Sequence, residues 1–203
     1  MKKNLWISLM MTIATTVLFG LIYPLIVTAL AQLIFPHNAN GQLIVKNGTV
    51  VGSSIIGQGF SAPQYFHSRP SAAGNGYDAA NSGGSNLGPT NQKLLDRVNT
   101  DIASAQIENP SPRVPIDLVT TSASGLDPHI TPAAAEFQLS RVAGARGIAM
   151  QELRAIVTEH TEGRQFGVLG EPRVNVLELN LDLDKQFPST TTAQTIIRTG
   201  SID

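Results

Sequence analysis

The segment Ser124–His129 (SGLDPH) places an acidic side chain two residues before an imidazole. Asp127 and His129 could form an acid–base pair, or they could be two of the three or four ligands that a zinc site needs. Asp182 and Asp184 could complete such a metal site, but they alternate along a predicted strand and are expected to face water. Asp127 is instead expected to accept backbone hydrogen bonds in a tight turn. We therefore predict no metal site.

Nucleophilic catalysis has weaker support. The sequence contains no G-x-S-x-G elbow, and its four histidines are scattered. Arg69-Pro70-Ser71 and Glu171-Pro172-Arg173 each set charged residues beside a rigid proline. Each indicates either a structural ion pair at a turn or a docking contact, and the spacing does not choose between them. No catalytic residue is predicted.

The stretch 81–91 (NSGGSNLGPTN) is an uncharged loop rich in glycine, serine and asparagine. It could contact phosphate, because we expect it to lead into a helix capped by Thr90, and free N–H groups at a helix start favour anions. However, Gly88 is followed by Pro89-Thr90 rather than the Lys-Ser/Thr of a Walker loop. No Lys or Arg lies between Arg69 and Lys93 to balance phosphate charge. We therefore prefer a structural turn and protein contact, and keep nucleotide contact as the alternative.

The N-terminal segment predicts a membrane helix. No Asp, Glu, Lys or Arg lies between Lys3 and Lys46, and the apolar run Leu5–Phe35 would be about 46 Å long as a helix. This exceeds the roughly 20 residues that span a bilayer, and the 7–15 residues of a signal peptide's apolar region. We thus expect a retained anchor, although Ala29-Leu30-Ala31 imitates a cleavage site. The only nearby cations precede it, so the N-terminus is predicted to be cytoplasmic and the domain extracytoplasmic.

Small or polar residues recur at every fourth position of this helix. In lipid, such a stripe lets another helix approach closely; the alternative is that the Ser and Thr side chains bond to their own backbone. We favour a packing face for a membrane-embedded partner or a second copy. This stripe consists of Ser8, Thr12, Thr16, Gly20, Pro24, Thr28 and Gln32.

The soluble part opens with a predicted β-hairpin over 43–51, turned by Asn47-Gly48. Residues 52–90 form a long loop region that we expect to pack down through its aromatic side chains. Helices are predicted after Thr90 as far as Asn109-Pro110, from Thr131-Pro132, and over about 148–161. Strands are predicted at Val114–Thr120 and Val174–Leu183.

These elements predict an α/β or α+β domain with a small sheet and about three helices. The expected organisation is a cytoplasmic end and membrane helix over 1–36, a single domain over 37–186, and a tail over 187–203 that lacks a clear pattern and for which disorder is one interpretation. The formal net charge of −1 argues against nucleic acid as a partner. The absence of cysteine excludes a disulfide framework and thiolate metal sites.

Several long strings of residues together resemble one family, the C subunit (KdpC) of the bacterial Kdp potassium-transporting P-type ATPase. The resemblance covers about residues 4–184. The strings are Gly52-Ser53, Ile56-Gly57-Gln58, Tyr65-Phe66, Arg69-Pro70-Ser71, Ser82–Asn91, Asp117–Thr120, Ser124–Ile130, Arg141-Val142-Ala143 and Gly170–Asn175.

The resemblance implies a role that the spacing of residues does not. The family complex couples ATP hydrolysis by a P-type pump subunit to potassium uptake through a channel-like subunit, and the C subunit is a non-catalytic member that holds it together. The family is also described as a catalytic chaperone that raises ATP affinity, with the loop containing Ser82, Gly83, Gly84, Ser85 and Asn86 proposed to contact nucleotide. ATP would then be bound chiefly through the pump subunit, and potassium would be the transported ion.

The predicted topology conflicts with nucleotide contact, because ATP is cytoplasmic and the loop is expected outside the cell. An outer domain fits better as a cap over the ion entrance of the channel-like subunit. The expected location is the inner membrane, with lipid and the two larger subunits as partners. A stand-alone membrane-anchored periplasmic binding module and a secreted hydrolase are the alternatives; the stripe argues against the first, and the missing nucleophile–base pair against the second.

Overall fold

The computed structural model describes residues 1–110 and 113–188. The chain divides into two compact units, Met1–Ser53 and Ser54–Asp203. The predicted tail lies outside the described residues, except for Phe187 and Pro188. Phe187 packs against the core of the second unit.

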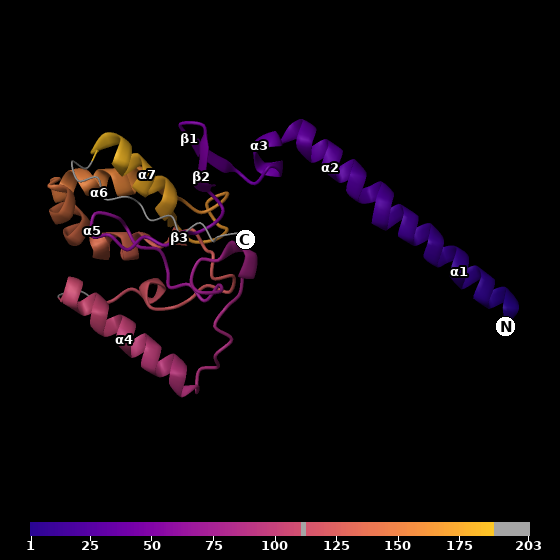
Figure 1. The fold of residues 1–203 in the computed structure, drawn as a ribbon, viewed down its shortest axis with the longest axis horizontal. Coiled ribbons are helices and arrows are strands. Elements are labelled where there is room, and N and C mark those ends of the chain that lie inside the picture. The colour runs from indigo at the N-terminus through magenta and orange to yellow at the C-terminus, as the bar shows by residue number, and fades with distance from the viewer. Residues whose placement is uncertain (111–112, 189–203) are drawn as a thin grey trace. The chain divides into compact units, whose positions relative to one another are not determined.

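One long helix dominates the first unit, as the apolar run predicts. It comprises α1 (Lys2–Val17), a π-helical turn (Leu18–Ile22) and α2 (Tyr23–Ile34), followed by the short α3 (Pro36–Ala39) (Figure 1). The 33-residue span Lys2–Ile34 is long and apolar enough to cross a membrane, and none of its residues is buried within the chain. Pro24 lacks an N–H and crowds the preceding turn, so the wider π-turn just before it accommodates the ring.

The predicted hairpin is also present in the first unit. Strands β1 (Leu43–Lys46) and β2 (Thr49–Ser53) pair antiparallel, with Val45 opposite Val50 and Lys46 opposite Thr49. Asn47 and Gly48 take φ values of 53° and 79°, as a type I′ turn requires.

The second unit mixes helices with a small antiparallel sheet of order β3-β5-β4, which confirms the predicted fold class. Strand β5 is central: Ile130 and Thr161 both pair with Val174. The order of elements is a 3₁₀ turn (Ala79–Asn81), α4 (Gln92–Glu108), a second 3₁₀ turn (Ile116–Leu118), β3 (His129–Ile130), α5 (Pro132–Arg146), α6 (Met150–Glu159), β4 (Thr161–Glu162), β5 (Arg173–Asn175) and α7 (Val176–Gln186).

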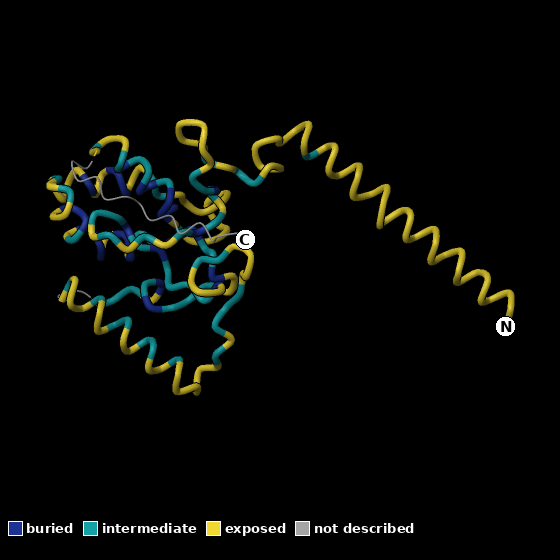
Figure 2. The backbone as a smooth tube through the Cα atoms, in the orientation of Figure 1, coloured by how far each residue is buried: buried dark blue, intermediate teal, exposed yellow. Residues whose placement is uncertain are grey.

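The apolar core lies among α5, α6, α7 and β5 (Figure 2). Leu139, Leu153, Leu179 and Leu183 are almost completely buried there, and Phe66 joins them from the long loop region. Thr131 caps α5 by accepting from the Ala134 N–H at 3.1 Å, as predicted. Helix α4 differs, because none of its 17 residues is buried.

The sequence prediction fails at three elements. Val114–Thr120 is not a strand: after Pro115 it forms the 3₁₀ turn Ile116–Leu118. Val174–Leu183 is a strand only as far as Asn175, and α7 follows. Asn91, rather than Thr90, caps α4, through a 2.9 Å hydrogen bond from the Lys93 N–H.

The loop region is held down by polar side chains of two helices. Asn180 of α7 accepts from the Phe66 N–H at 2.8 Å and donates to its carbonyl at 2.9 Å. Gln138 of α5 does the same for His67, at 2.7 and 3.2 Å. These amides take the place of a neighbouring strand, so buried backbone groups in an irregular segment remain satisfied. The expectation that this region packs down is confirmed.

Candidate functional site

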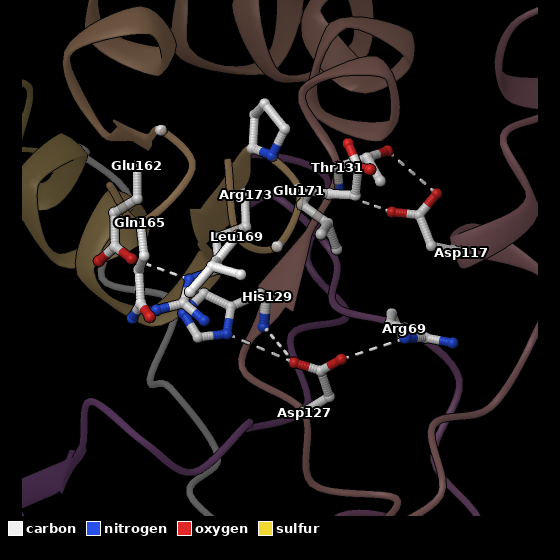
Figure 3. A pocket seen from close by; sticks show the side chains of 14 residues that line it. Arg69, Asp117, Asp127, His129, Thr131, Glu162, Gln165, Leu169, Glu171 and Arg173 are labelled. Atoms are coloured by element: carbon white, nitrogen blue, oxygen red, sulfur yellow. Dashed lines mark hydrogen bonds and ion pairs between the residues drawn. The ribbon is translucent and has the colours of Figure 1, made fainter. Parts of the chain in front are cut away.

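A hollow of about 400 Å³ is lined by residues of all three strands of the sheet and by the loops beside them (Figure 3). Its lining comes from the segments that the sequence marked as chemically interesting and from the loop between β4 and β5. The lining residues are Arg69, Asp117, Asp127, His129, Ile130, Thr131, Glu162, Gly163, Gln165, Leu169, Gly170, Glu171, Pro172 and Arg173.

Asp127 lies between Arg69 and His129 in this hollow (Figure 3). One carboxylate oxygen accepts from Arg69 Nη1 at 3.1 Å, and the other accepts from the His129 N–H at 3.0 Å, as a tight turn predicts. Burial alone would raise the pKa of Asp127, but hydrogen bonds from His129 and the charge of Arg69 outweigh it and hold this pKa below its usual value. Asp127 is therefore an ionised anchor, and Arg69 forms the structural ion pair that was one of its two interpretations.

Asp117 has a structural role that the sequence prediction missed. Its side chain is buried and accepts from the Thr131 N–H at 2.6 Å and from Thr131 Oγ1 at 3.2 Å. It thereby ties the turn Ile116–Leu118 to the start of α5. Pro115 was the sequence signal for this role. Proline disfavours a strand interior, so Asp117, two residues later, is free to accept hydrogen bonds from the start of a helix.

The charged side chains of the hollow are paired rather than converging on an empty point, although the partner of Glu171, Arg164, lies outside its lining. Among the lining residues only Thr131 carries a hydroxyl, and this group is already bonded to Asp117. The closest approach of the His129 ring to an acid is 3.4 Å, to Asp127. A nucleophile–base pair needs the nucleophile within hydrogen-bond reach of the base, which this lining does not provide.

Asp182 and Asp184, considered as additional metal ligands, lie on α7 with partners of their own. Asp182 is 3.0 Å from His160 Nε2, and Asp184 is 2.9 Å from Arg146 Nη2. The described residues contain no group of three or more acidic or imidazole side chains that could hold a metal ion.

The predicted contact loop Ser82–Asn86 lies against the Ser124–His129 motif. The Gly83 N–H and Ser82 Oγ both donate to the Ser124 carbonyl, at 2.8 and 3.0 Å. A Cβ at Gly84 would lie 3.0 Å from the Ala123 carbonyl oxygen. The structure thus brings together two segments that are about 40 residues apart, through backbone contacts that need glycine.

The segments of this junction approach one another most closely at Gly125. Its φ is +68°, and a Cβ there would lie 2.6 Å from the Ala73 nitrogen and 2.7 Å from the Gly83 oxygen. Ser71 Oγ donates to its carbonyl at 2.6 Å. Three separate sequence segments therefore meet at one glycine, which gives the loop a structural reason for its composition.

Comparison with known proteins finds relatives whose similarity covers nearly the whole chain. The family model described as "K+-transporting ATPase, c chain" (KdpC) matches residues 5–185. A potassium-transporting ATPase KdpC subunit of Koribacter versatilis is 64% identical over 191 residues, covering 94% of this chain and 99% of its own length. Those of Acidobacterium capsulatum and Rhodospirillum rubrum are 58% and 56% identical, covering 90% and 93% of this chain and 98% of each relative.

The chain belongs to the KdpC family. The matched range contains both the membrane-length helix and the domain, and it ends at the last turn of α7. As a KdpC-family member, the chain is a subunit of a potassium-transporting ATPase, which confirms the family resemblance. One N-terminal apolar helix is consistent with single-pass anchoring of such a subunit.

The members of the stripe on the helix of this KdpC-family chain are in three different situations. Ser8 Oγ donates to the Leu5 carbonyl at 2.9 Å, as the alternative interpretation predicts. Gln32 exchanges amide hydrogen bonds with Asn40 at 3.3 and 3.4 Å, so it has a partner within the chain. Gly20 leaves open space, since a Cβ there would meet only Thr16 Cγ2 at 3.8 Å. A row with spacing four drifts around a helix of 3.6 residues per turn, and the wider π-turn Leu18–Ile22 takes up part of that drift.

Proposed function

We propose that this chain is a non-catalytic accessory subunit of an ATP-driven potassium uptake complex. It assembles with the P-type pump subunit and the channel-like subunit, and stabilises their association. The observation that carries the proposal is the family match across both the membrane helix and the domain. The paired side chains of the hollow form no nucleophile–base pair, which supports an accessory role rather than a catalytic one.

We further propose that the domain lies outside the inner membrane. Lys2 and Lys3 precede the helix, and the next cation is Lys46, so the positive-inside rule favours a cytoplasmic N-terminus. In that position the domain is available to cap the ion entrance of the channel-like subunit. Potassium is then the cargo of the complex rather than a ligand of this chain.

The loop Ser82–Asn86 is better suited to protein contact than to ATP. Its backbone is already engaged with Ser124, and the sequence around it supplies no cation for a triphosphate. Direct nucleotide contact, as in the chaperone description of the family, is the competing role. If the loop does not contact ATP, the pump subunit alone binds the nucleotide.

Co-purification through a tag on this chain tests the proposal. We expect the other ATPase subunits to remain attached in mild detergent, and the chain alone to hydrolyse no ATP. Gly20→Leu should weaken that attachment at least several-fold while membrane insertion persists, because added bulk separates closely packed helices. Val17→Leu, which lies off the stripe, is the matched control.

Two results would count against the proposal. The first is an ATPase that is fully assembled and active without this chain. The second is a domain that resists protease in intact spheroplasts but is cut in inverted vesicles, which would reverse the orientation and favour the chaperone role.

A further inference from the structure

The loop between β4 and β5 presents apolar side chains to solvent. Phe166 is 93% exposed, Val168 71% and Leu169 56%. Single exposed apolar residues are common on protein surfaces, whereas a cluster of them at a loop tip marks an interaction site. We call residues 163–172 the Phe166 loop.

Phe166 is held outward in a conformation that is unfavourable for its residue type. Its φ is +53°, in the left-handed region that bulky side chains rarely adopt. Such a conformation costs about 1–2 kcal/mol. With its side chain 93% exposed, Phe166 makes few contacts with the described residues that could offset this cost. Strain of this kind at an exposed residue indicates a role in binding.

The loop is ordered before any partner arrives. The Gln165 N–H donates to the Leu169 carbonyl at 2.8 Å, and the Leu169 N–H returns to the Gln165 carbonyl at 2.9 Å. Across the base of the loop, Arg164 pairs with Glu171 at 2.7 Å and Arg173 with Glu162 at 2.8 Å. A loop that is ordered before binding loses less conformational entropy on binding than a flexible one.

The charge at the base of the loop favours a protein partner over an anionic membrane. Two arginines and two glutamates pair with each other, which leaves no excess positive charge. Binding to anionic lipid depends on such an excess of Lys and Arg. An aromatic anchor of about 150–250 Å² with a neutral polar rim instead matches the centre of a protein interface.

We propose that the Phe166 loop is a docking element, and that Phe166 inserts into an apolar socket on another subunit of the ATPase. The proposal rests on the accessory-subunit function above and adds the surface that makes the contact. Val168 and Leu169 flank the anchor, and the paired charges form the rim of the interface.

Phe166→Asn is the sharpest variant, because asparagine tolerates positive φ and is polar. We expect the melting temperature of the full chain in detergent to stay unchanged or to rise, while its dissociation from the other subunits becomes about tenfold faster or more. A residue with a merely structural role would lower the melting temperature as well. The matched control is Ile107→Gln on α4, which alters a side chain that is 85% exposed and should leave dissociation unchanged.

A fluorescence reporter identifies what covers the loop. The chain has a single tryptophan, Trp6, so Trp6→Phe combined with Phe166→Trp places the only indole at the loop tip. The proposal requires a blue shift on adding the other subunits. A blue shift in lipid vesicles without them would mean a membrane contact, and a shift that depends on the concentration of this chain alone would mean self-association. Either would overturn the proposal.

The outcome for docking is separable from that for the proposed function. If the unmodified chain fails to co-purify with other ATPase subunits, the accessory function itself is wrong. If the unmodified chain and the Phe166→Asn variant dissociate equally slowly, only the docking role of the loop is wrong.

Discussion

Two glycine-containing loops of the domain lie in opposite environments. The loop Ser82–Asn86 packs against Ser124 of its own chain through backbone hydrogen bonds, whereas the Phe166 loop holds an aromatic ring in solvent. The first contains two glycines and the second three, so both look in composition like flexible connections. What separates them is the space where each missing Cβ would lie. At Gly84 of the first loop that space is backed by backbone atoms of Ala123, whereas at the three glycines of the Phe166 loop it is open.

The largest expected effect comes from the glycine that closes the first junction. Gly125→Ala adds a Cβ within 2.6–2.9 Å of Ala73 and Gly83, at a φ of +68°. We expect the free energy of unfolding to fall by about 3–4 kcal/mol, from the left-handed conformation together with overpacking. Denaturant unfolding of the full chain in detergent measures the change.

Gly167→Ala is the matched control for this substitution. It shares a positive φ of +76°, but a Cβ there would meet no atom within 4 Å. Only the conformational cost of about 1 kcal/mol remains. Equal losses at Gly125 and Gly167 would contradict the distinction between the two loops.

Gly84→Val should have an intermediate effect. Its Cβ would press on the Ala123 carbonyl at 3.0 Å, which costs about 1–3 kcal/mol and displaces the loop. We expect weaker assembly or slower potassium transport without a specific change in ATP affinity. Gly83→Val, where no atom lies within 4 Å, should change little.

Calorimetry with the full chain completes that prediction. We expect no saturable ATP binding at sub-millimolar concentration. Saturable binding that disappears in the Gly84→Val variant would show that the nucleotide role is correct and the structural one is wrong.

The sequence predicts best where a local signal has a single outcome. Asn47-Gly48 admits a type I′ turn, Thr131-Pro132 starts a helix, and an uncharged apolar run of this length forms one long helix. All three are present in the structure. Each of these signals lies within a few neighbouring residues or one continuous run, so no distant contact is needed to interpret it.

One of the failures occurs where two periodicities overlap. Val174–Leu183 alternates apolar and polar residues like a strand, but Val176, Leu179, Asn180 and Leu183 also form one buried helical face. The helical pattern is hard to see because Asn180 looks like a surface residue. Its amide is required at a core position by the backbone of Phe66, which lies 114 residues away. The capping pattern Asn175-x-x-Glu178 was the local signal that could have corrected the prediction.

The candidate site was predictable as a set of segments but not as an arrangement. The sequence identified Arg69, Asp127, His129 and the loop Ser82–Asn86, and it left open what they contact. The ion pair between Arg69 and Asp127 and the junction at Gly125 depend on segments about 40 to 60 residues apart. In the Phe166 loop the sequence marked only its end, Glu171-Pro172, as part of an ion pair or a docking contact, and it did not identify Phe166. Its sequence signal, an aromatic residue followed by glycine, is too common to indicate an exposed anchor.

The smallest expected effect comes from comparing the ion pair of Asp127 with the ion pair of Glu171 at the base of the Phe166 loop. Asp127 has a pKa below its usual value, so its stabilisation is present at neutral pH and is lost as the pH falls below about 4, through the folded-state pKa. Asp127→Asn should therefore lower the free energy of unfolding at pH 7 by about 1–2 kcal/mol and flatten the acid limb of the pH–stability profile. Glu171→Gln at the base of the Phe166 loop breaks a pair whose carboxylate is 76% exposed and should change stability little at any pH. Thermal melts of both variants between pH 3 and 8 test this contrast. An Asp127→Asn variant with the same acid limb as the unmodified chain would show that this ion pair does not contribute to the pH dependence of stability.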